Sequence, residues 1–158
     1  MNAQTAIGNV LATGEMVGMA YIGDLSDAEL MQRPHLKCNH INWQIGHLIV
    51  SENQLVGKIA TMPSLPSGFA EKYSKEKAVS DDPSQFAKKD ELLSAYRDQR
   101  NATLGVLSGM NADDLARETG IEYAPTRGAL ISLMGEHWLM HSGQWVIVRR
   151  ENGKPIVI

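Results

Sequence analysis

The sequence predicts an all-α protein, an antiparallel four-helix bundle, and three observations favour this fold. Four long segments carry apolar residues at the three- and four-residue spacing of an amphipathic helix. Each spans about 20 to 25 residues, or about 30 to 38 Å, which is the helix length that such a bundle needs. No segment between them alternates as a convincing strand would. Because 158 residues is the size of one ordinary domain, we expect residues 1–158 to form a single domain.

The first helix is expected over residues 2–22. Several glycines interrupt it, among them Gly14 and Gly18, and each costs about 1 kcal/mol relative to alanine in a helix. Small residues of this kind permit the close approach of a neighbouring helix. Residues 24–30, Asp-Leu-Ser-Asp-Ala-Glu-Leu, then predict a short helical turn that Pro34 ends.

The second helix is expected over residues 40–60 and ends before Pro63. Residues 61–83 are polar and rich in Lys, Ser and Asp, which is typical of a connection between helices. Its length predicts a crossover loop between the second and third long helices. The third helix is expected to begin at Ser84, which serves as N-cap, and to end at Gly109.

The fourth helix follows a short acidic connector at residues 111–115, which is similar to the earlier one. Each connector precedes a histidine-bearing helix, which suggests two related helical hairpins. Thr126 is predicted to cap the fourth helix, which covers residues 127–150 and ends before Gly153. The apolar tail at residues 156–158 is interpreted either as a small strand or as an interface segment.

Composition and charge exclude several classes of protein. Fifteen Lys and Arg against 18 Asp and Glu give a net charge of −3, so we expect neither nucleic acid nor an anionic membrane as a partner. The single cysteine, Cys38, excludes an intramolecular disulfide framework and a Cys-rich zinc module. Residues 1–14 lack the basic start of a secretory signal, and the uncharged run at residues 38–51 is too short and polar to cross a bilayer. We therefore expect a cytoplasmic protein.

The histidines carry the candidate chemistry. His137 and His141 lie four residues apart in the fourth helix, so their rings lie on one face and can reach a common ion. His47, within the apolar pattern of the second helix, is the best candidate for a third ligand. Three neutral imidazoles leave a coordination position free for water or substrate, as in catalytic zinc sites. Zinc and nickel, with iron as the third choice, suit such a site better than magnesium or calcium.

Spacing alone leaves open an alternative in which these histidines are ordinary core or surface residues. For His35 and His40, before or at the start of the second helix, a solvated or capping role is expected. Gln44 and Ser51 flank His47 on the same helix face and are candidates to support the ligands from behind. Gln144, three residues after His141, is the better candidate for that role.

Other residues near the histidines have simpler interpretations. Glu52 and Glu136 are candidate acid–base groups, but a solvated or hairpin-bridging role is expected for both. Trp43, Trp138 and Trp145 are expected to line the core or a pocket.

Two motifs resemble those of the DinB-like superfamily. Residues 39–48, Asn-His-Ile-Asn-Trp-Gln-Ile-Gly-His-Leu, are similar to its second-helix signature, which ends in Gly-His-Leu. Residues 136–144, Glu-His-Trp-Leu-Met-His-Ser-Gly-Gln, resemble its fourth-helix signature, His-x-x-x-His followed by Gly-Gln. The resemblance covers essentially the whole chain and implies a bundle that binds a divalent ion, often nickel or zinc, through His47, His137 and His141. Many members have Arg directly after the last histidine, where this chain has Ser142.

The resemblance leaves two classes of function open. The superfamily includes transferases and isomerases that use low-molecular-weight thiols, so one expectation is a metal-dependent transferase or hydrolase acting on a small molecule or thiol. The alternative is a non-catalytic, stress-associated metal-binding scaffold or dimeric interaction protein. We expect a homodimer, with residues 145–148 and 156–158 as candidate interface segments. Metal removal separates the two classes, because an enzyme keeps its fold whereas a scaffold loses stability.

Overall fold

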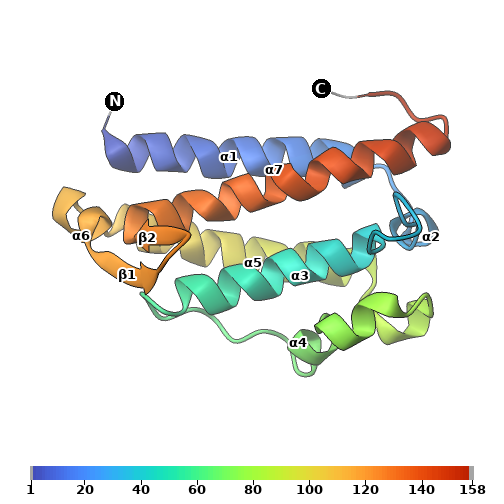
Figure 1. The fold of residues 1–158 in the computed structure, drawn as a ribbon, viewed down its shortest axis with the longest axis horizontal. Coiled ribbons are helices and arrows are strands. Elements are labelled where there is room, and N and C mark those ends of the chain that lie inside the picture. The colour runs from blue at the N-terminus through green and yellow to red at the C-terminus, as the bar shows by residue number, and fades with distance from the viewer. Residues whose placement is uncertain (1, 157–158) are drawn as a thin grey trace.

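Four long helices dominate the computed structural model, which describes residues 2–156 (Figure 1). They are α1 (Ala3–Ile22), α3 (Ile41–Val56), α5 (Lys89–Ser108) and α7 (Arg127–Glu151). The predicted all-α four-helix bundle is therefore confirmed. The last helix ends within one residue of the predicted position, at Glu151. It begins where predicted, because the Thr126 hydroxyl accepts a hydrogen bond from the backbone N–H of Ala129 at 3.2 Å, as an N-cap should.

The helices run in two directions. α1 and α7 point the same way and lie side by side, whereas α3 and α5 point the opposite way (Figure 1). Asn42 of α3 donates to the Ala87 carbonyl just before α5, and Asn53 donates to Gln99 farther along both helices. Because α3 and α5 are parallel, the chain between them must return along the bundle, which explains the long crossover that the sequence predicts.

Two glycines bring α1 and α7 into close contact. A Cβ on Gly14 would lie 2.5 Å from the carbonyl oxygen of Gly135, and a Cβ on Gly18 would lie 2.7 Å from the Trp138 ring. Such distances are shorter than van der Waals contact, so larger side chains would push the helices apart. The expectation that small residues in the first helix permit close approach is confirmed.

The crossover at residues 57–88 is more ordered than a polar loop. It contains three short helices, α4 (Phe69–Lys72), η1 (Lys75–Val79) and η2 (Pro83–Gln85). Phe69 and Tyr73 are buried against the bundle. The Tyr73 hydroxyl donates to Asn42 Oδ1 at 3.1 Å and accepts from the Ala87 N–H at 3.0 Å. The crossover therefore packs on α3 and holds it from outside the bundle.

Two helix ends differ from the prediction. α3 ends at Val56 rather than near residue 60. α5 begins at Lys89, and the prediction that Ser84 caps it is wrong. The Asp82 carboxylate accepts hydrogen bonds from the backbone N–H and hydroxyl of Ser84, so these residues form a 3-10 turn instead. The chain then extends through Phe86 before the long helix starts.

A short hairpin contradicts the expectation that no strands form between the helices. β1 (Glu118–Ile121) pairs antiparallel with β2 (Ala124–Thr126). Burial alternates along β1, but its residues Glu-Thr-Gly-Ile include one apolar side chain and β2 has only three residues, so the sequence shows no alternation of apolar and polar residues there. The pairing is anchored by burial of Ala124 and by a hydrogen bond from the Thr119 hydroxyl to the Ala124 carbonyl.

The two acidic connectors form short helices of the same kind. They are α2 (Asp27–Leu30) and α6 (Ala112–Ala116). Each begins with a capping box, formed by Ser26 with Glu29 in one and by Asn111 with Asp114 in the other. The similarity that the sequence indicates therefore extends to local structure.

Two further observations concern the chain as a whole. In the described part of the chain, no helix has both the length and the apolar composition required to cross a membrane. Of the C-terminal tail, Ile156 is exposed, and Val157 and Ile158 lie outside the described residues. The prediction of a strand or an interface segment there stays a prediction.

Candidate metal centre

Three histidines converge between α3 and α7. His47 lies on α3, and His137 and His141 lie one turn apart on α7, which runs antiparallel to α3. One ring nitrogen from each lies within 4.8 Å of the others. The Nε2 atoms of His137 and His141 are 3.2 Å apart, and the His47 ring centre is 5.4 and 5.8 Å from those of its two neighbours. The structure therefore brings together the three histidines that the sequence selects.

The tautomer of His141 follows from its neighbours. Gln44 Oε1 lies 2.9 Å from Trp145 Nε1 and 2.9 Å from His141 Nδ1. An indole nitrogen can only donate, so the Gln44 atom between them must be the amide oxygen. His141 Nδ1 must then carry a proton in order to bond to that acceptor. In the neutral ring this leaves the lone pair on Nε2, the atom that faces His137.

Gln44 is itself held on its other side. Its amide nitrogen donates to the Asn39 carbonyl at 2.6 Å and to Gln144 Oε1 at 3.1 Å. Both amide protons are thereby satisfied, and the side chain has one orientation. The prediction that Gln144 is the better candidate to support the ligands is wrong, because Gln44 contacts His141 directly whereas Gln144 contacts Gln44.

The position of His47 depends on packing on both sides of α3. The Trp43 ring stacks on the His47 ring, with centres 5.0 Å apart and planes 5° from parallel. At Gly46, an added Cβ would lie 2.1 Å from the Tyr73 ring of the crossover. The glycine before the histidine thus has a physical cause, because any side chain there would displace the aromatic ring that supports α3.

Burial keeps all three rings uncharged. Burial, with a smaller contribution from His47, lowers the pKa of His137 to about 4. Burial and the two neighbouring histidines lower the pKa of His141 to about 4. Burial, and then the charge of Lys75, also lowers the pKa of His47. At neutral pH the rings are therefore neutral, which is the state that ligates a cation.

This donor set fits a divalent transition ion. Two imidazoles that hold zinc at about 2.0 to 2.1 Å in tetrahedral geometry place their nitrogens about 3.3 Å apart. The 3.2 Å between His137 and His141 is close to that value. Neutral nitrogen ligands favour zinc, nickel or iron over the oxygen-seeking magnesium and calcium. The bond from His141 to the Gln44 amide supplies the outer support that such ligands require.

A cavity of about 350 Å³ opens beside the cluster. Three polar residues, His47, His137 and Ser51, line it, together with the apolar or aromatic residues Leu55, Tyr123, Leu133 and Met140. Ser51 is the residue that helix spacing predicts on the His47 face. Tyr123 was not predicted, because it reaches the cavity from the turn of the β1–β2 hairpin, which the sequence does not indicate.

The other two histidines have structural roles. His35 is exposed, and its Nδ1 accepts the backbone N–H of Lys37 at 3.2 Å. His40 is fully buried and caps α3, with Nδ1 accepting the Trp43 N–H at 2.9 Å. The capping role expected for His40 is confirmed, but its side chain is not solvated. Burial, with Arg33 nearby, lowers the pKa of His40 to about 4.

The candidate acid–base carboxylates lie elsewhere. Glu52 forms a buried ion pair with Arg100 at 2.9 Å, so it links α3 to α5 as a bridging residue. Glu136 is exposed and accepts a hydrogen bond from Ser132 at 2.9 Å. Neither lines the cavity beside the histidines.

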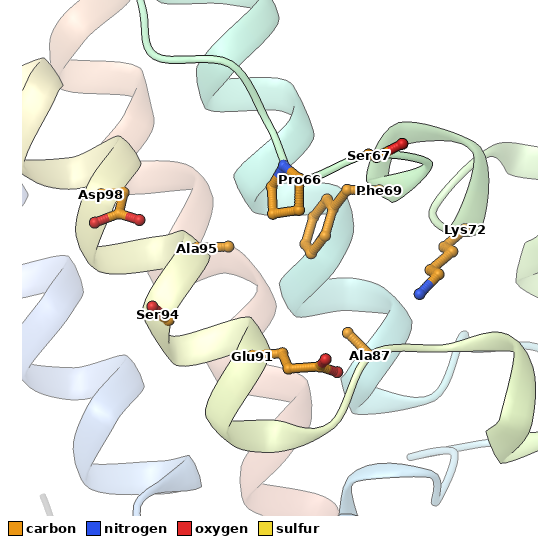
Figure 2. Close-up of a pocket in the computed structure, with 9 residues that line it drawn as sticks. All are labelled: Pro66, Ser67, Phe69, Lys72, Ala87, Glu91, Ser94, Ala95 and Asp98. Carbon is orange, nitrogen blue, oxygen red and sulfur yellow. The ribbon is translucent and has the colours of Figure 1, made fainter.

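A separate cavity of about 270 Å³ lies between α4 and α5 (Figure 2). Phe69 and Lys72 approach it from α4, and Glu91 and Asp98 approach it from α5 (Figure 2). The charged groups around it are exposed, and none of the three clustered histidines lines it. The candidate metal centre is therefore the histidine cluster and not this cavity.

A four-helix bundle with a long crossover and three histidines on two facing helices defines an all-α protein with a candidate metal site. The sequence matches the DinB superfamily over residues 14–145, and the chain belongs to this superfamily. None of the curated proteins matches the chain. A conserved protein from Enterococcus faecalis, known from a crystal structure, has a similar fold, with a TM-score of 0.71 and 17% sequence identity. The match covers 98% of this chain and 99% of that one.

Proposed function

We propose that this member of the DinB superfamily is a metal-dependent enzyme of the transferase or hydrolase type. His47, His137 and His141 would hold one divalent transition ion, zinc or nickel before iron. A small molecule, with low-molecular-weight thiols among the candidates, would bind in the cavity beside them. When bound, such an ion acts as a Lewis acid and lowers the pKa of a water or thiol ligand.

The tautomer of His141 is the observation that carries this proposal. Gln44 fixes the proton on Nδ1, so that Nε2 presents its lone pair toward His137 at 3.2 Å. A core histidine would also need hydrogen bonds, but here the ring nitrogens of His47, His137 and His141 all lie within 4.8 Å of one another as well. Supporting a ring nitrogen from behind with a carbonyl or carboxylate oxygen is typical of metal-ligating histidines.

The chain's own residues would bind and orient the substrate. Three histidine ligands would leave an ion free to accept a further ligand, and the cavity adjoins His47 and His137. A ligand seated against the apolar side chains of the cavity would displace water from them, which would strengthen polar interactions beside it. Ser51, on the cavity wall, offers a hydroxyl near His47.

The first experiment is elemental analysis of the purified protein beside a His137→Ala, His141→Ala double variant. We expect about one zinc, nickel or iron per chain, lost in the double variant. His35→Ala is the matched control, because it removes an exposed histidine that lies outside the cluster. Protein that carries no ion and takes up neither added zinc nor added nickel would contradict the proposal.

The second candidate function is a non-catalytic metal-binding scaffold that acts as a homodimer. It is favoured by exposed apolar side chains on the two adjacent helices α1 and α7, of which Met16 and Ile147 are examples. Light scattering of the metal-loaded and metal-free proteins tests it. A dimer that forms only with metal bound would support the scaffold, whereas a metal-loaded monomer would contradict it.

A further inference from the structure

We propose that the cavity beside the histidine cluster selects uncharged, apolar ligands, and that Tyr123 is the residue at its mouth that limits their size. The selectivity rests on the cavity alone, whereas the presentation of such a ligand to an ion rests on the proposed function. The structure supports the inference through the lining of the cavity, the exposure of its rim and the anchoring of the hairpin.

In the metal-free protein, the lining contains no counter-ion for a charged ligand. Leu55 from α3 and Leu133 and Met140 from α7 supply its aliphatic walls. No Asp, Glu, Lys or Arg is among the described residues that line it. The charge of Lys75 acts on His47 from outside the lining. A carboxylate or ammonium group that enters would still gain no ion pair with a lining residue, and its loss of water is costly. An uncharged apolar group would instead bury its surface against the leucines.

Two large apolar side chains stand exposed at the cavity. Tyr123 is 69% exposed and Met140 is 61% exposed, although both are residue types that gain from burial. A contiguous exposed apolar surface next to polar ring nitrogens is typical of a binding site. The volume of about 350 Å³ is at the small end of the range for small-molecule sites.

The hairpin gives Tyr123 a defined position in the lining of the cavity. The tyrosine lies in the turn between β1 and β2, and β2 leads directly into α7. Ala124, the next residue, is fully buried. The Thr119 hydroxyl donates to the Ala124 carbonyl and accepts the Ile121 N–H, so the turn is held on both strands. A large aromatic ring on an anchored turn restricts the space available to a ligand.

Ligand binding to the metal-free protein tests the selectivity without any dependence on activity. Benzyl alcohol and benzoate have similar size and differ in charge, and amide NMR shifts report where and how tightly each binds. We expect benzyl alcohol to shift the signals of Ser51, Leu55 and Tyr123, and benzoate to bind about tenfold or more weakly. Equal affinities would overturn the proposal. So would failure of benzyl alcohol to bind at millimolar concentration, or shifts confined to Ala87 and Ala95 of the other cavity (Figure 2).

A matched pair of charge variants sharpens the test. Met140→Lys places a cation at the cavity, and Ile147→Lys places one on the same helix two turns away, where the side chain is 42% exposed and lines no part of the cavity. We expect Met140→Lys to bind benzoate more tightly than the wild type does, and Ile147→Lys to leave the preference for benzyl alcohol unchanged. Similar behaviour of the two variants would show that the preference arises outside the cavity.

The role of Tyr123 has its own comparison. Tyr123→Ala removes the ring at the mouth, and Tyr123→Phe keeps it. We expect 2-naphthalenemethanol to gain affinity relative to benzyl alcohol in the alanine variant only. Equal gains in both variants, or no gain in either, would refute the size limit. Zinc uptake by the wild-type protein, measured separately, distinguishes the two proposals. A protein that binds no zinc but prefers benzyl alcohol contradicts only the proposed function. A protein that binds zinc but has no preference between the two ligands contradicts only this inference.

Discussion

Replacing Gln44 by leucine removes the group that orients His141. The wild-type amide makes four side-chain hydrogen bonds, and its oxygen accepts two of them, from His141 and Trp145. Leucine has a similar volume but no acceptor. The imidazole would then be free to rotate or to move its proton to Nε2, and either change withdraws the lone pair that faces His137.

Two magnitudes follow from these contacts. Loss of the outer partner of a metal-ligating histidine lowers metal affinity by about 10- to 100-fold. Trp145 is fully buried, so its indole N–H loses its partner without access to water. A buried donor left unpaired costs about 1 to 3 kcal/mol of stability. His141 can relax by changing its tautomer, so we assign the stability cost chiefly to the indole.

Zinc titration against a chromophoric chelator measures the affinity, and urea unfolding of the metal-free protein measures the stability. A ¹⁵N NMR experiment on the His141 ring reports which nitrogen carries the proton. Gln144→Leu is the control, because Gln144 bonds to the Gln44 amide nitrogen and leaves the acceptor for His141 in place. We expect Gln144→Leu to change zinc affinity far less than Gln44→Leu does.

Two outcomes would refute the reasoning. If Gln44→Leu binds zinc with wild-type affinity while His141→Ala does not, the orienting role of the amide is wrong. If Gln144→Leu weakens zinc binding as much as Gln44→Leu, the effect arises from general loosening between α3 and α7.

Three further predictions concern the surroundings of the cluster. Gly46→Ala places a Cβ in the Tyr73 ring, so we expect a loss of about 1 to 3 kcal/mol in urea unfolding and weaker zinc binding; unchanged unfolding would contradict this packing. Arg100→Met leaves Glu52 buried and unpaired and should cost about 3 to 5 kcal/mol, whereas the double variant with Glu52→Leu should cost less; equal losses would argue against a buried pair. Burial lowers the pKa of His40 from 6.5 to about 4, so between these values the unfolded chain binds a proton that the folded chain does not, and the free energy of unfolding falls as the pH falls through that window. His40→Asn, which keeps a capping group, should make the pH profile of metal-free protein shallower but not flat, because His47, His137 and His141 also have lowered pKa values; parallel profiles would exclude the contribution of His40.

The sequence predicts the long helices because their features are local. Apolar spacing and a capping threonine at position 126 depend only on residues a few positions apart, and both agree with the structure. Ser84 shows where local reasoning fails, because two capping residues compete there. The Asp82 carboxylate accepts hydrogen bonds from Ser84, so these residues form a separate 3-10 turn and the helix starts only at Lys89. The hairpin was missed because burial of Ala124 against the rest of the protein, and not strand propensity, stabilises it.

In the candidate site, too, local features could be predicted from the sequence and features that depend on tertiary packing could not. Helix spacing places His137 and His141 on one face, and the structure brings His47 to them. Spacing also places Gln44 beside His47, but its bond to His141 depends on the register between α3 and α7, which sequence periodicity does not contain. The contribution of Tyr123 to the cavity depends on a hairpin that packs at the base of α7.

The way the four helices are joined bears on the choice between enzyme and scaffold. Arg100 of α5 binds Glu52 of α3 and also donates to the carbonyl oxygens of Leu11 in α1, at 3.2 Å, and Met134 in α7, at 3.4 Å. One buried guanidinium thus links all four helices without any ion. Gly14 and Gly135 join α1 to α7 independently. Because these contacts need no metal, an ion at the histidine cluster would add stability to a fold that already has its own supports.

The expected result of metal removal follows from these contacts. Protein treated with a chelator should keep its helical circular dichroism and unfold cooperatively, at a temperature only modestly below that of the zinc-loaded form. Arg100→Met should lower the unfolding temperature of both forms, because none of the hydrogen bonds of Arg100 involves the three histidines. A chelated protein that loses its helices would instead favour the scaffold, since the ion would then be a condition of folding. A protein that keeps its fold on metal removal but no longer binds a ligand to the ion behaves as a catalytic centre does. We expect this result because the contacts of Arg100 join the four helices without an ion.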